Sequence, residues 1–138
     1  MKGFYWALAT TVLWGIAPIF EKMAIDRTSP LPLLTVRSIL LAGTLLTITL
    51  VSGKGHQLLA LDRSTILLIA LGALFGALLG LYTYFTALKL GEASRVIPIA
   101  ASYLLVTTIL AILFLGEKIT VSKIIGAALI VGGILLLR

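Results

Sequence analysis

Residues 64–87, STILLIALGALFGALLGLYTYFTA, contain no charged side chain. A bilayer core about 30 Å thick is crossed by roughly 20 helical residues, so this stretch is long enough to span a membrane. Further apolar stretches of comparable length lie at about 4–24, 32–52, 96–116 and 121–137. The sequence therefore predicts five transmembrane helices.

The composition of the whole chain agrees with a lipid environment. Of its 138 residues, 60% are hydrophobic and 12% are charged, and the mean hydropathy is +1.18. A typical water-soluble domain carries about 25% charged residues. Lys2 and the apolar run after it resemble a signal peptide, but the triplet Ala7-Leu8-Ala9 falls too early for a cleavage site. We therefore interpret this segment as the first spanning helix.

Short polar segments separate the apolar stretches, at 26–32, 52–63, 90–94 and 116–120. None of them is long enough to fold by itself, so we predict a single helical domain over residues 1–138. The net charge of +6 comes from Lys and Arg residues scattered between apolar runs, without a basic stripe, and predicts no nucleic-acid partner.

Several chemical classes of site are absent from the sequence. There is no cysteine, which excludes disulfides and thiolate ligands, and the one histidine, His56, is too few for a metal site. No nucleophile with a base and no phosphate-binding loop is present. We therefore predict no cofactor, no metal and no enzymatic activity.

The positive charge is almost evenly shared between the two membrane faces. Membrane topology follows the Lys and Arg bias of short loops. One face receives Lys2, Lys54, Arg63, Lys118 and Lys123; the other receives Lys22, Arg27, Lys89, Arg95 and Arg138, once Arg37 is set aside as lying inside its helix. This balance predicts insertion in both orientations and hence antiparallel dimers. The alternative is that one charge such as Lys2, or a partner protein, fixes the orientation.

Specific motifs in the chain resemble a known family. They are Trp14-Gly15 with Pro18 and Lys22, Arg37, the segments 87–94 (ALKLGEAS), 113–120 (LFLGEKIT) and 126–133 (GAALIVGG), and Pro98. Together they resemble the EamA-type domain of the drug/metabolite transporter superfamily over essentially the whole chain. Family members usually carry a second proline near Ser102 to Leu104, which this sequence lacks.

The resemblance implies a fold and a mechanism. Full-length members of this family look like two five-helix units fused in tandem. Because each unit has an odd number of spans, the second unit enters the membrane in the inverted orientation. The expected fold class is thus an all-α membrane protein whose five transmembrane helices form one half of an inverted-repeat transporter bundle. The implied partners are the lipid bilayer, a small-molecule solute, and a second copy or another five-helix unit. A prokaryotic cytoplasmic membrane is the expected location.

Pro18 predicts a local irregularity inside the first span. It cannot donate a backbone hydrogen bond to the carbonyl of Trp14, and its ring clashes with that carbonyl, so we expect a kink around Trp14 and Gly15. A freed carbonyl at this depth is tolerated where protein or a watery cavity satisfies it. Trp14, Gly15 and Pro18 are therefore candidates for lining a substrate path, with a kink that only improves packing as the alternative.

Among the aromatic residues, Trp14 and Tyr103 lie deepest in their spans, so Tyr103 joins the path candidates. The other Trp and Tyr residues fit the membrane interface better. Small residues recur every four positions in two spans and predict close helix packing. They are Gly72, Gly76 and Gly80 in the third span, and Ala128 and Gly132 in the fifth.

Arg37 is the charged residue that the sequence places inside a span. It lies about two turns from the start of its helix, so its side chain can snorkel to the boundary, and we favour this snorkelling or a structural role. The functional alternative is that it pairs with an anionic substrate or with Glu21 across a partner helix. Because every acidic residue lies at or beyond a helix end, we expect no proton relay through a central carboxylate.

These observations favour a transporter protomer that moves a small metabolite or amphipathic compound by alternating access, as an antiparallel dimer. The alternatives are a non-transporting membrane subunit or regulator, and one half of a heteromeric transporter.

Overall fold

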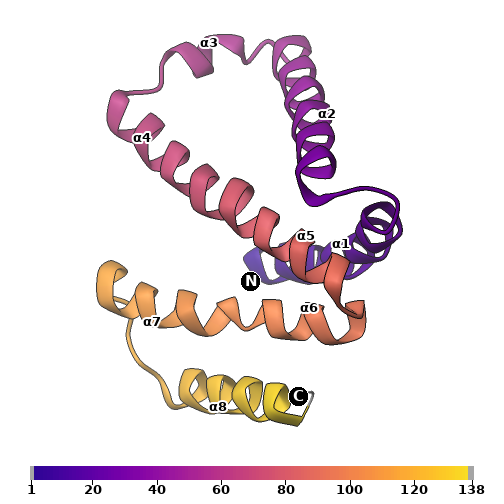
Figure 1. The fold of residues 1–138 in the computed structure, drawn as a ribbon. Coiled ribbons are helices and arrows are strands. Elements are labelled where there is room, and N and C mark those ends of the chain that lie inside the picture. Colours follow the sequence, from indigo (N-terminus) through magenta and orange to yellow (C-terminus); the bar gives the residue numbers. More distant parts are fainter. Residues whose placement is uncertain (1, 137–138) are drawn as a thin grey trace. The chain divides into compact units, whose positions relative to one another are not determined.

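The computed structural model describes residues 2–136, and the regular elements in this range are helices (Figure 1). Four helical stretches are long and apolar enough to cross a membrane: Gly3–Ile25, Pro30–Val51, Arg63–Leu90 and Ala93–Leu115. The fifth apolar helix, Val121–Leu136, is shorter, with 16 residues. The prediction of an all-α membrane protein with about five membrane helices is confirmed.

The described residues form two compact units, divided after Leu90. The first unit contains α1 (Lys2–Ile25), α2 (Pro30–Val51), α3 (Gly55–Leu59), α4 (Arg63–Gly72), the π-helix η1 (Ala73–Gly80) and α5 (Leu81–Leu90). The second contains α6 (Ala93–Ala101), α7 (Tyr103–Leu115) and α8 (Val121–Leu136).

Local sequence sets the ends of α2. Ser29 has an extended backbone, with φ −109° and ψ 161°, and Pro30 occupies the first helical position, where its missing N–H costs nothing. At the other end Gly53 adopts φ +70°. The N–H of Gly53 donates to the carbonyl of Leu50, and that of Lys54 donates to the carbonyl of Thr49. This pair of bonds is a Schellman motif, which glycine favours because it tolerates positive φ.

Asp62 begins α4 in the same local manner. Its carboxylate accepts hydrogen bonds from the backbone N–H groups of Ser64 and Thr65, at 3.0 and 3.2 Å, and from the Thr65 hydroxyl at 2.5 Å. These bonds stabilise the ionised carboxylate, the Thr65 hydroxyl most of all, and hold the pKa of Asp62 below its usual value. Asp62 is therefore the N-cap that starts the long helical stretch Arg63–Leu90.

The middle of that stretch is the π-helix η1, in which hydrogen bonds join residues five apart. A Cβ atom at Gly80 would lie 2.8 Å from the carbonyl oxygen of Phe75, five residues earlier. Real Cβ contacts essentially never come so close, so a residue larger than glycine requires the backbone to shift. Glycine at position 80 thus permits the wide helical turn.

The first unit packs tightly where α1, α2 and α5 meet. From this junction α2 and α4 diverge toward α3, which connects them (Figure 1). The fully or nearly fully buried apolar side chains are Ile25 of α1, Leu34 of α2, and Phe85 and Leu88 of α5. Most large apolar side chains elsewhere are exposed, as expected for helices whose solvent is lipid.

In the second unit the fourth predicted span is interrupted at Ser102, between α6 and α7. The N–H and the hydroxyl of Ser102 both donate to the carbonyl of Ile99, at 3.1 and 2.6 Å, and the N–H of Leu105 donates to the carbonyl of Ser102. These three-residue bonds tighten the helix locally. The irregularity therefore occurs without the second proline that family members carry.

Candidate functional site

The densest polar cluster among the described residues lies where α1, α2 and α5 meet. On α1, one face carries Pro18, Glu21, Lys22 and Ile25, which are spaced three, four and seven residues from the first. Residues with this spacing share one side of an α-helix. Pro18 and Ile25 are buried, so this face of α1 packs inward and takes two charged side chains with it.

Arg37 of α2 forms an ion pair with Glu21 of α1 through its Nη1. The side chain of Glu21 is 17% exposed and that of Arg37 is 35% exposed. The guanidinium carbon of Arg37 lies 5.7 Å from the centre of the Phe85 ring, a cation–π arrangement with α5. Tyr84, the neighbour of Phe85, lies near the Glu21 carboxylate.

Two lysines join the C-terminal ends of α1 and α5 reciprocally. Lys22 of α1 donates to the carbonyl of Leu88 at 2.9 Å, and Lys89 of α5 donates to the carbonyls of Ile25 and Thr28, at 2.8 and 2.6 Å. The last carbonyls of a helix have no partner within the helix, and a cation near them is also favoured by the helix dipole. Each helix therefore supplies the cap of the other.

The ion pair lies inside the spans but away from their middle. Arg37 is seven residues after Pro30, a rise of about 10 Å, and Glu21 is four residues before Ile25, a rise of about 6 Å. Lys22 lies one position beyond Glu21 and is paired with Asp26 at 2.8 Å. The ion pairs Lys22–Asp26 and Arg37–Glu21 of the first unit thus both lie toward one membrane face.

The predicted path residues of α1 are only partly drawn into this cluster. Pro18 is buried and lies three residues before Glu21 of the cluster. The helix α1 continues on both sides of this proline. Trp14 is 65% exposed, and a Cβ atom added at Gly15 would meet no atom of another described element within 4 Å. Tyr103 begins α7 in the second unit and is about half exposed.

The predicted packing glycines of the third span differ from one another. Gly72 and Gly76 have no atom of another described element within 4 Å of an added Cβ, whereas Gly80 meets the carbonyl of Phe75 of its own helix. In α8, Ala128 is exposed and Gly132 likewise has open space around it. The role of these small residues in packing against another chain stays a prediction.

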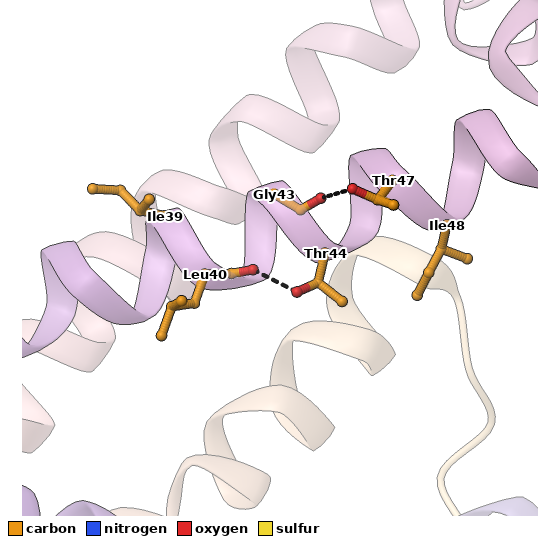
Figure 2. Close-up of a pocket in the computed structure, with 6 residues that line it drawn as sticks. All are labelled: Ile39, Leu40, Gly43, Thr44, Thr47 and Ile48. Carbon is orange, nitrogen blue, oxygen red and sulfur yellow. Dashed lines mark hydrogen bonds between the residues drawn. The ribbon is translucent and has the colours of Figure 1, made fainter.

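A shallow hollow of about 450 Å³ lies along α2, lined by Ile39, Leu40, Gly43, Thr44, Thr47 and Ile48 (Figure 2). The hydroxyls of Thr44 and Thr47 donate to the carbonyls of Leu40 and Gly43, four residues earlier on the same helix, at 2.8 Å each. All of the lining comes from α2, and its polar side chains are already satisfied. This surface supplies no recognition chemistry by itself.

The second unit has an apolar hollow of about 250 Å³ between α6, α7 and α8. Pro98, Ala101 and Leu104 face Leu129, Ile130, Gly133 and Ile134 across it. None of these side chains carries a charge or a hydroxyl. This hollow of the second unit therefore supplies no polar recognition group, whereas the helix junction of the first unit contains the Arg37–Glu21 ion pair.

Sequence reasoning identified Arg37 but did not assign Phe85, Lys22 and Lys89 to a site. Pro18, Glu21, Lys22 and Ile25 on α1, and Phe85, Leu88 and Lys89 on α5, each share a helix face by their spacing. That spacing was the available signal. The sequence favoured a snorkelling or structural role for Arg37, with pairing to Glu21 across a partner helix as the alternative. In the structure Arg37 pairs with Glu21 on a neighbouring helix of the same chain.

Five apolar helices with charged residues at their ends are typical of a membrane protein, and comparison with known proteins agrees with this class. The sequence matches the EamA-like transporter family over residues 1–138. The chain belongs to this family. It is accordingly a multi-pass integral membrane protein of a transporter family, which confirms the resemblance drawn from its motifs.

Two curated relatives of this EamA-like protein align over nearly their whole length. A Sinorhizobium protein named as an uncharacterized transporter in the cobO 3'region is 29% identical over 133 residues, which are 96% of this chain and 94% of the relative. An uncharacterized protein of Methanocaldococcus jannaschii is 28% identical over 130 residues, 94% of this chain and 91% of the relative. No solved structure matches the chain. Both relatives are therefore about as long as this five-helix chain.

Proposed function

We propose that this EamA-like protein is a transporter protomer that moves a small metabolite or amphipathic compound by alternating access. The substrate path would form between two oppositely oriented five-helix units, in the homodimer or with a second such unit. The observation that carries the proposal is family membership of a chain with five apolar helices, an odd number. In a tandem fusion an odd number of spans inverts the second unit, and the proposed antiparallel dimer would reproduce that arrangement with two separate chains.

The arrangement of the first unit supports this proposal. Its helices are fixed to one another at the junction of α1, α2 and α5, while α2 and α4 diverge away from it. Rigid contacts at one end and apolar surface along the rest suit an element that tilts against a partner. The family and the relative named as a transporter both favour transport over catalysis.

Direct transport is tested with purified protein in vesicles loaded with a defined panel of amino acids, organic acids and aromatic amines. A transporter empties the vesicles of at least one solute faster than protein-free vesicles lose it, as measured by mass spectrometry after filtration. Retention of the whole panel at the protein-free rate would favour a non-transporting subunit or regulator. A signal that appears only after a second five-helix protein is added would favour a heteromeric transporter.

The antiparallel dimer is tested by the orientation of the chain in the membrane of intact cells. The absence of cysteine allows single cysteines at Gln57 in α3 and Ser29 in the link between α1 and α2, both exposed. Ser29 makes no side-chain cap hydrogen bond, so its replacement is mild. Dual insertion predicts that an impermeant thiol reagent labels about half of each variant. Full labelling of one and full protection of the other would exclude the antiparallel homodimer.

Both curated relatives come from prokaryotes, a bacterium and an archaeon. We place the protein in a prokaryotic cytoplasmic membrane on this basis. Fractionation of cells that express the chain at its natural level tests the location.

A further inference from the structure

The guanidinium of Arg37 has more donors than its described partners use. Arginine carries five N–H groups, and here Nη1 donates to Glu21 while the Phe85 ring lies beside the guanidinium at 5.7 Å. None of the buried side-chain nitrogens or oxygens among the described residues lacks a partner, so the Arg37 nitrogens without a hydrogen bond are not fully buried. Arg37 is also twice as exposed as Glu21, at 35% against 17%. The free edge of the guanidinium can therefore receive a second oxyanion.

The other charged groups around the pair are already engaged. Lys22, next to Glu21 on α1, binds Asp26 and the carbonyl of Leu88. From α5, Lys89 binds the carbonyls of Ile25 and Thr28, and Tyr84 lies near Glu21. From α2, Arg37 is the charged group that faces the carboxylate. The charge state of this site thus depends on Glu21, Arg37 and whatever binds to them.

Charge balance determines what a bound anion requires. The pair is neutral when Glu21 is ionised, and a bound carboxylate would bring a net negative charge into a partly buried site within the spans, which is costly. Protonation of Glu21 restores neutrality, because Arg37 then pairs with the incoming anion. Arginine suits this exchange since its planar fork binds carboxylates in a bidentate manner.

We propose that Arg37 binds an anionic solute with a carboxylate or a similar oxyanion, and that Glu21 takes up a proton as the anion binds. The ion pair between Nη1 and Glu21 breaks, the guanidinium pairs with the oxyanion, and a proton from solution converts the Glu21 carboxylate to the neutral acid. Rebinding of Glu21 to Arg37 releases both proton and anion. This inference rests on the proposed transport function and makes it a coupled movement of a proton and an organic anion in the same direction.

The proposal departs from the expectation that the sequence suggested for proton coupling. Glu21 lies too near the end of α1 to act as a central carboxylate, and for that reason the sequence predicted no such relay. The structure adds a partner on α2, so a carboxylate away from the middle of the span has an exchangeable binding partner.

The test uses the purified full chain in detergent with sodium acetate as the probe. Wild-type protein at weak buffering should take up a proton when acetate binds, seen as a rise in pH beyond that of a protein-free blank. Acetate should also raise the thermal unfolding midpoint above that in sodium chloride of equal ionic strength. Glu21→Gln removes the competing carboxylate, so acetate should bind at least about tenfold more tightly, which corresponds to about 1.4 kcal/mol, without proton uptake.

Arg37→Gln should abolish both the stabilisation by acetate and the proton uptake. The matched control is Arg27→Gln, because Arg27 is an exposed arginine in the link after α1 that forms no ion pair among residues 2–136. It should behave as wild type. If wild type shows no specific acetate effect, or if Arg27→Gln lowers the effect as much as Arg37→Gln does, the anion site is refuted.

Proton uptake on acetate binding is measured on the wild-type protein alone, so the proposal can be tested even if a variant does not fold. Vesicles that move only cationic or neutral solutes, with no acetate effect in detergent, would refute the anion site and leave transport in place. Proton-linked acetate binding by a protein that moves no solute would instead refute the transport function.

Discussion

Replacement of Lys89 by Met tests whether the reciprocal lysine caps hold the first unit together. Lys89→Met keeps the apolar stem and removes two charge-assisted hydrogen bonds, a part-buried one to Ile25 and an exposed one to Thr28. Hydrogen bonds to charged groups contribute about 1.5–3 kcal/mol when shielded and far less when exposed. Taking about 1.5 kcal/mol for the first and about 0.5 kcal/mol for the second, we expect a loss of about 2 kcal/mol.

Lys22→Met should cost a similar amount, since it removes a part-buried bond to Leu88 and an exposed i,i+4 pair with Asp26 worth about 0.4 kcal/mol. Both lysines fasten the same two helix ends. Once one cap is lost, the other contributes less to stability. The double variant should therefore lose about 1 kcal/mol less than the sum of the losses of the two single variants.

The assay follows denaturation of the detergent-solubilised protein by sodium dodecyl sulfate. Energy transfer runs from the two tryptophans, both on α1, to a dansyl group on a cysteine at Gln57 of α3. Lys54→Met is the matched control, because the Lys54 amino group makes no hydrogen bond to residues 2–136. If Lys89→Met and Lys54→Met unfold within about 0.5 kcal/mol of each other, the caps do not stabilise the junction.

Three further substitutions probe other parts of the fold in the same unfolding assay. Gly80→Ala should lower the free energy of unfolding by about 1–3 kcal/mol, since its Cβ would lie 2.8 Å from the carbonyl oxygen of Phe75. Gly76→Ala has open space around its Cβ and should leave that free energy unchanged or raise it by up to about 1 kcal/mol. Equal effects of the two substitutions would contradict a special role of Gly80 in η1. Phe85→Leu should cost about 1–2 kcal/mol, through lost core volume and the lost cation–π contact with Arg37, and an unchanged midpoint would argue against that contact. Asp62→Ala should lower stability at pH 7. Because the pKa of folded Asp62 is depressed, its stabilisation is present above the unfolded pKa and is lost as the pH falls below about 4. Between about pH 5 and about pH 3 the variant should therefore lose less stability than the wild-type protein.

Much of the membrane fold follows from one-dimensional properties of the chain. Charge-free stretches longer than a bilayer crossing predict spanning helices, and the observed Pro30–Val51 and Ala93–Leu115 lie within a few residues of the expected 32–52 and 96–116. The ends were also predictable where the signal is local. Pro30 follows a polar link and is favoured at the first position of a helix, and Gly53, which tolerates positive φ, is favoured at the end of one.

The π-helix and the break at Ser102 were less accessible to sequence reasoning. A regular four-residue spacing of Gly72, Gly76 and Gly80 suggested an α-helical strip, but η1 pairs residues five apart across that region. The break at Ser102, four residues after Pro98, occurs without a second proline, through bonds from the N–H and hydroxyl of Ser102 to Ile99. Such choices depend on competition between alternative backbone bonds that a residue pattern does not resolve.

By itself the sequence determined the solvent, the number of membrane helices, the family and the presence of an arginine within a span. Hydropathy and motif order act along the chain, so they can be recognised without coordinates. Only the tertiary structure decided which groups meet. Glu21 and Arg37 are 16 positions apart, and Lys22 and Leu88 are 66 apart, so their pairing depends on how α1, α2 and α5 come together in space. That packing turns a charge that could have snorkelled alone into one member of an ion pair whose remaining donors are free to bind an anion.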